Sequence, residues 1–73
     1  MSLVFTRHAK KRMDERGVTA AEVETVLRRP IGQRPGNGGN IIVQGQVTLG
    51  RAIEVVVSGT DRESVISVWV REV

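Results

Sequence analysis

Three runs of alternating polar and apolar residues in the second half of the chain constrain its fold most strongly. They cover residues 40–47, 51–58 and 64–71, and short turn segments separate them. Strands joined by turns this short form an antiparallel meander, in which successive side chains point to opposite faces. The more apolar face would hold Ile41, Val43, Ile53, Val55, Val57, Ile66, Val68 and Val70. The mixed face would hold Gln44, Gln46, Glu54, Ser58, Ser67, Trp69 and Arg71.

A first helix is predicted over about residues 7–16. Thr6 is a candidate N-cap for it, and Gly17 stands where a left-handed C-cap would lie. The preceding segment, residues 3–5, can form a short edge strand or an apolar lead-in.

A second helix is predicted over about residues 20–29. Thr19 and Glu22 have the spacing of a capping box at its start, and Pro30 follows its last residue. Residues 31–39 are rich in Gly, Pro, Asn and Gln, which is typical of a mobile loop.

Together these elements predict one α+β domain over residues 1–73. Both helices would pack on the apolar face of a three-stranded or four-stranded antiparallel sheet, and the mixed face would stay open for binding. A chain this short has a thin core, and with no cysteine and one histidine it has no disulfide or metal site of its own to support it. No apolar run approaches the roughly eighteen residues of a membrane span. Since residues 1–5 are too short for a signal peptide, we expect a cytoplasmic protein without a membrane partner.

The positive charge is concentrated in the first half of the chain. Residues 1–36 hold eight Lys and Arg against four acidic residues, for a net charge of +4. Residues 37–73 hold three Arg against four acidic residues, for a net charge of −1. Such asymmetry is typical of proteins that meet nucleic acid, an anionic surface or an acidic partner.

The first helix carries cations on the side that should face the core. A helical wheel places Arg16 within its apolar stripe, with His8 and Arg12 at the border of that stripe. One interpretation is structural: the arginine stems lie on the sheet and their charged ends reach solvent, while His8 covers the edge of the core. The other is functional: three nitrogen donors converge on a phosphate or carboxylate.

The same three residues are the candidate catalytic group. His8 has an unperturbed pKa near neutrality, so it is the natural general base or acid at pH 7. Metal-free RNA cleavage needs such a base together with cations for the charge that develops on phosphorus, which Arg12 and Arg16 can supply.

Four more residues are candidates for binding RNA or phosphate. Lys11, Arg51 and Arg71 can contact phosphate, and Trp69 on the open face can stack on an unpaired base. The structural alternative for Trp69 is that it closes one end of a small sheet.

The sequence lacks the residues that other classes of enzyme require. The acidic residues are scattered over the predicted helix, strand and turn, so clustered carboxylates for two-metal chemistry are missing. One histidine without cysteine is too few ligands for zinc, and there is no nucleophile elbow or cysteine–histidine pair for acyl transfer. We therefore expect neither a metal nor a cofactor.

The motifs His8-Ala9, Arg12-Met13 and Arg16-Gly17-Val18 resemble the opening of a bacterial family known as domain of unknown function 4258. The resemblance continues through most of the chain, at Val23, Val26-Leu27, Pro30 and Val65-Ile66-Ser67-Val68.

A more distant similarity is to the BrnT-type toxins. It rests on Gly17-Val18, Pro30, Thr48-Leu49-Gly50-Arg51 and Val65-Ile66-Ser67. This similarity implies the small fold of the RelE-like ribonucleases, cleavage of RNA and neutralisation by a partner antitoxin. The chain departs from that pattern after Ser67, where Val68 and Trp69 stand in place of a strand-borne arginine.

The leading hypothesis is thus a toxin-like, metal-independent endoribonuclease of a toxin–antitoxin system. The first alternative is a non-catalytic module that binds RNA or a protein through the sheet face around Trp69 and Arg71. The second is a small homodimer that completes its thin core by pairing an edge strand.

Overall fold

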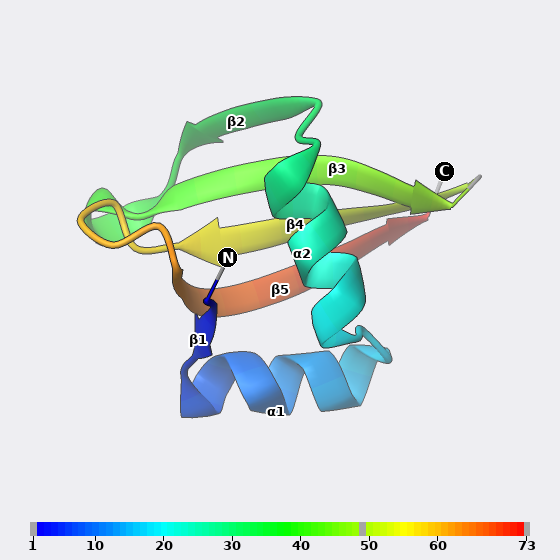
Figure 1. Cartoon of the computed structure of the whole chain (residues 1–73), viewed down its shortest axis with the longest axis horizontal. Coiled ribbons are helices and arrows are strands. Elements are labelled where there is room, and N and C mark those ends of the chain that lie inside the picture. The colour runs from blue at the N-terminus through cyan, green and yellow to red at the C-terminus, as the bar shows by residue number, and fades with distance from the viewer. Residues whose placement is uncertain (1, 49, 73) are drawn as a thin grey trace.

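The computed structural model describes residues 2–48 and 50–72, and the strands among them form one five-stranded mixed sheet (Figure 1). The order across the sheet is β1-β5-β4-β3-β2. The strands are β1 (Val4–Phe5), β2 (Gly32–Pro35), β3 (Ile41–Thr48), β4 (Arg51–Val57) and β5 (Ser64–Glu72). β3–β4 and β4–β5 pair antiparallel, as the short turns between these segments predict. β2 also pairs antiparallel with β3, whereas β1 is parallel to β5.

The prediction of three or four antiparallel strands was therefore wrong in number and in the direction of one strand. The expected loop at residues 31–39 instead contains β2 and a short 3-10 turn, η1 (Asn37–Gly39). Gly38 and Gly39 both have positive φ there, at 64° and 80°, which lets the chain reverse into β3. Pro35 fits in β2 because β2 is an edge strand, where a missing N–H costs no ladder bond.

The helices α1 (Arg7–Arg16) and α2 (Ala20–Arg28) begin at the caps that their sequences predict. The Thr6 side chain accepts a hydrogen bond from the Ala9 N–H at 3.1 Å, and Gly17 ends α1 with φ of 66°. Thr19 and Glu22 form a complete capping box at the start of α2. Neither helix is long and apolar enough to cross a membrane in the part of the chain that the structure describes.

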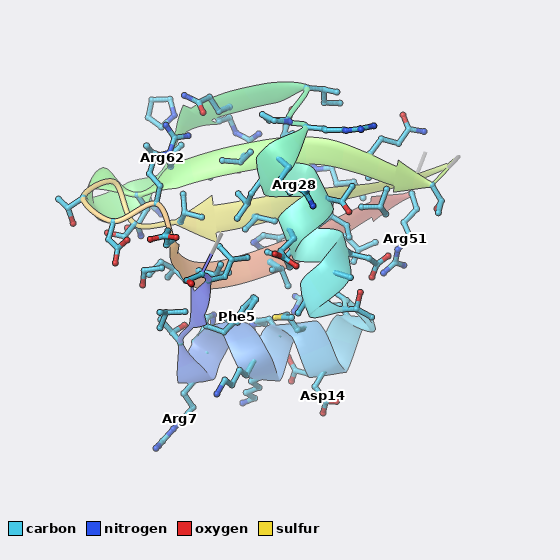
Figure 2. The ribbon with its side chains drawn as sticks, viewed as in Figure 1. Phe5, Arg7, Asp14, Arg28, Arg51 and Arg62 are labelled. Carbon is cyan, nitrogen blue, oxygen red and sulfur yellow. The ribbon has the colours of Figure 1, made fainter. Side chains whose placement is uncertain are left out.

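The two helices cover different parts of the sheet (Figure 1). α2 crosses β3 and β4, whereas α1 lies along β5 and contacts β1. Figure 2 shows Phe5, the last residue of β1, between α1 and the sheet, while Arg7 and Asp14 point away from the sheet. The core between helices and sheet consists of Ala9, Val18, Val23, Val26, Val43, Ile53, Val55, Val57, Val65 and Val68.

At one position of β5 the core holds Val65 in place of the predicted Ile66. Simple alternation puts Ile66 in the core, but the register shifts between β4 and β5 so that Val57 pairs with Val65 and Val56 with Ser67. This bulge makes Val65 fully buried and leaves Ile66 half-buried.

Gly45 sets how closely α2 approaches the sheet. The residue is buried in β3, and a β-carbon added there would lie 3.1 Å from Cα and Cγ1 of Val26 in α2. A side chain at this position would push the helix away from the strand.

We therefore expect Gly45→Ala to lower the free energy of unfolding by about 1–3 kcal/mol, the usual cost of overpacking a core. Urea denaturation would measure the change. Gly32→Ala is the matched control, because a β-carbon there meets only Oε1 of Gln44, at 3.6 Å. Equal stability of the two variants would contradict close packing at Gly45.

Candidate functional site

The face of the sheet turned away from α2, called the open face below, carries a row of polar side chains. Its residues on β2 to β5 are Arg34, Ile42, Gln44, Gln46, Ala52, Glu54, Val56, Ser67, Trp69 and Arg71. Strand pairing places Gln44 opposite Glu54 and Glu54 opposite Trp69, so these three side chains cross the sheet in one line.

Glu54 is the centre of a polar network on this face. Arg34 donates to both of its carboxylate oxygens, from Nη1 at 3.0 Å and from Nη2 at 3.2 Å. Gln44 Nε2 donates to Oε2 at 2.6 Å, and Arg71 Nε lies 3.3 Å from the same oxygen. Glu54 is 5% exposed, and a carboxylate can be buried this deeply because it is paired and hydrogen-bonded.

The hydrogen bonds from Arg34 lower the pKa of Glu54 below its ordinary value of 4.5. Burial of the carboxylate acts in the opposite direction, and the bond from Gln44 and the charges of Arg34 and Arg71 lower the pKa further. Glu54 is therefore ionised at neutral pH, and its hydrogen-bond capacity is used on its neighbours.

Trp69 lies next to this network and is half exposed, at 51%. The guanidinium carbon of Arg16 stands 4.4 Å from the centroid of the Trp69 ring, a cation–π contact. Arg16 can reach the open face because α1 lies beside β5, the strand that carries Trp69. The contact limits the orientations that the indole ring can take.

A shallow cavity of about 620 Å³ extends from Trp69 across the sheet to Arg34. Its lining comes from four strands and consists of Arg34, Ile42, Glu54, Trp69, Val70 and Arg71. The lining holds two guanidinium groups against one carboxylate, so the cavity has a net positive charge. We call it the Trp69 cavity.

The candidate catalytic residues of α1 do not converge on one anion site. Arg12 Nη1 donates to Glu15 on the same helix at 2.6 Å. Arg16 contacts the Trp69 ring, and its Nη1 lies 3.8 Å from the same Glu15 carboxylate. His8 is exposed and makes no side-chain hydrogen bond to any residue in the ranges 2–48 and 50–72. Arg12 is thus engaged by an acidic residue of its own helix.

Among the phosphate-binding candidates, Trp69 and Arg71 share the open face, whereas Lys11 is exposed on α1. Arg51 lies elsewhere, near the start of α2 (Figure 2). Its Nε donates to Glu22 at 3.0 Å and its Nη2 donates to the Gly17 carbonyl at 3.0 Å. Arg51 therefore ties β4 to the connection between the two helices.

Three members of the network, Glu54, Arg34 and Gln44, were not among the candidate site residues predicted from sequence. Alternation places Gln44 and Glu54 on the mixed face, and this placement is the only sequence signal that points to them. No sequence pattern points to Arg34 as a site residue, because its segment has the composition of a loop.

Comparison with known families agrees with the motifs of α1. A family described as Domain of unknown function (DUF4258) matches residues 5–70. The chain belongs to this family. No curated protein and no solved structure matches the chain. The match covers α1, α2 and most of the sheet of this DUF4258 domain, including Glu54, Arg34, Gln44 and Trp69, and it ends one residue before Arg71.

The lowered pKa of Glu54 predicts how stability depends on pH. The pKa of Glu54 is lower in the folded chain than in the unfolded chain. The ionised carboxylate therefore contributes fully to the free energy of unfolding above its unfolded pKa, and this contribution is lost as pH falls through its folded pKa. We expect Glu54→Gln to cost roughly 1.5–3 kcal/mol at pH 7, the usual worth of hydrogen bonds to a charged group. Below pH 4.5 the difference from the natural chain should shrink. Thermal unfolding at pH 7 and below pH 4.5 measures the stability difference between Glu54→Gln and the natural chain. The exposed Asp14→Asn is the control. A stability difference that stays the same at the two pH values would contradict the Glu54 network.

Proposed function

We propose that this DUF4258 domain is an RNA-binding module that presents its open face to single-stranded RNA. The observation that carries the proposal is the half-exposed Trp69, which Arg16 contacts from α1 and which borders a cavity that also holds Arg34 and Arg71. Proteins that bind unpaired RNA use this combination, with aromatic rings for the bases and cations for the phosphates.

The charge distribution supports the same proposal. Arg16 and Arg34 belong to the basic first half of the chain, and the fold brings both to the face formed by the later strands. With Arg71 they bring three positive charges to this face, against the buried charge of Glu54 and the charge of Glu15, which lies 3.8 Å from Arg16. A solvated sheet face has no structural need for a large, half-exposed aromatic ring in contact with a cation.

The groups that line the Trp69 cavity support binding of RNA without its cleavage. Glu54 is ionised and its oxygens are occupied by Arg34, Gln44 and Arg71, so it is poorly suited to move a proton near pH 7. His8, the natural general base, does not line the Trp69 cavity. Among the described residues, no group of three or more His, Cys, Asp or Glu could hold a metal ion for catalysis.

We expect Trp69→Ala to weaken binding of a labelled single-stranded RNA of ten nucleotides by about 10- to 100-fold, because each stacked base contributes about 1–3 kcal/mol. Fluorescence anisotropy at several salt concentrations measures the affinity. Arg7→Ala is the control, since Arg7 points to solvent on α1 and its removal should change the affinity less than about threefold.

Two outcomes would overturn the proposal. One is equal binding of single-stranded and duplex RNA, because a paired base cannot stack on Trp69. The other is equal binding of poly-glutamate, which would identify the open face as a site for an acidic protein. A phosphate-dependent complex should weaken steeply as salt rises.

The endoribonuclease hypothesis, with its RelE-like fold and partner antitoxin, stays a prediction and has a separate test. It requires cleavage of RNA in the presence of a chelator and loss of cleavage in His8→Ala. Intact RNA after incubation with the natural chain would exclude it while leaving the binding proposal in place. Sedimentation of the protein at several concentrations would test the predicted homodimer.

A further inference from the structure

Arg71 meets Glu54 through one of its three guanidinium nitrogens. Its Nε is the atom that meets Glu54, at 3.3 Å, while the side chain is 65% exposed. Neither terminal nitrogen, Nη1 or Nη2, forms a hydrogen bond to the backbone or to the side chains that the structure describes. A guanidinium group anchored in this way presents two parallel donors, which is the geometry that binds phosphate oxygens.

The spacing between Arg71 and Trp69 matches the two ends of one nucleotide. The residues are two positions apart on β5 and on the same face, so their Cα atoms are about 7 Å apart. A nucleotide carries its planar base and its phosphate on opposite sides of one sugar. A base against Trp69 therefore leaves the phosphate near Arg71.

The cavity has the size and charge for such a ligand. Its volume of about 620 Å³ falls in the usual range for small-molecule sites, about 300–1,000 Å³. Arg34 lies on the opposite side of Glu54 from Trp69 and is 43% exposed, so it adds a second cation for the phosphate. Ile42 contributes an apolar part of the lining.

We propose that the Trp69 cavity binds a single nucleotide unit, with the base on Trp69 and the phosphate on Arg71 and Arg34, and that Glu54 is the positioning residue that orients both arginines. The inference rests on the proposed RNA-binding function and names the unit that the open face recognises. It implies that a free nucleoside monophosphate occupies the same site.

The chain contains one tryptophan and no tyrosine, so its intrinsic fluorescence reports directly from the cavity. We expect adenosine 5′-monophosphate to change the Trp69 emission in a saturable way, with an affinity at least fivefold higher than that of adenosine or inorganic phosphate. Equal affinity for the monophosphate and inorganic phosphate would overturn the role of the base. Equal affinity for the monophosphate and adenosine would overturn the role of the arginines.

Two variants test whether Glu54 affects binding of the monophosphate by orienting the arginines or only through its charge. Glu54→Gln makes the face more positive, so charge alone predicts tighter binding of adenosine 5′-monophosphate, whereas loss of positioning predicts binding at least threefold weaker. Asp14→Asn makes the same charge change on the solvent side of α1 and is the control. Tighter binding by Glu54→Gln would overturn the positioning role.

Arg71→Lys tests the anchored fork without risk to the fold, because Arg71 is mostly exposed. It keeps the charge and removes the pair of parallel donors, so we expect at least fivefold weaker binding of the monophosphate. Arg7→Lys should leave the affinity unchanged. Equal effects of these two variants would remove Arg71 from the site.

The single-stranded RNA titration distinguishes failure of this inference from failure of the proposed function. RNA binding that depends on Trp69, without detectable binding of the monophosphate, would overturn the single-nucleotide site and keep the RNA-binding module. Binding of the monophosphate without tighter binding of RNA would keep the site and identify a free nucleotide as the ligand.

Discussion

The hydrogen-bonded carboxylate of Glu54 is the interaction on which the open face depends. Glu54 lies on β4, and its partners Arg34, Gln44 and Arg71 come from β2, β3 and β5. One buried charge thus joins four strands on the side of the sheet that α2 does not cover. Its burial is possible because its partners compensate for the lost hydration, and the same partners lower its pKa. The two arginines are in turn held in place at the surface.

The opposite side of the sheet is held by apolar packing in a small volume. The core consists largely of valine, and Gly45 lets Val26 of α2 come within contact distance of β3. Close approach also occurs at one end of the sheet, where Gly59 lies directly against the Gly39 carbonyl and a side chain would clash with it. At the other end Arg51 joins β4 to Glu22 and Gly17. Polar contacts between distant segments thus supplement a thin core.

Much of the fold could be predicted because its signals are local. Thr6, Gly17 and the Thr19–Glu22 pair act within one turn of a helix, and alternation identifies the three long strands. β1 and β2 were less predictable, since two and four residues are too few to show a periodic pattern. The bulge at Ile66 could not be predicted from the sequence either, because it depends on how β5 aligns with β4. Arg34 was missed as a site residue for the same reason that β2 was missed as a strand.

The sequence by itself determined the two capped helices, the alternating strands and the placing of Trp69, Glu54 and Arg71 on one mixed face. Only the tertiary structure decided which partners these residues have. Arg16 contacts Trp69 because α1 lies beside β5, and Arg34 binds Glu54 because β2 pairs with β3 at one register. Arg12 and Arg51, with the same charge, bind Glu15 and Glu22 instead. An arginine side chain is long and binds whichever carboxylate or ring the fold brings within reach, so residue type and spacing alone do not determine its partner.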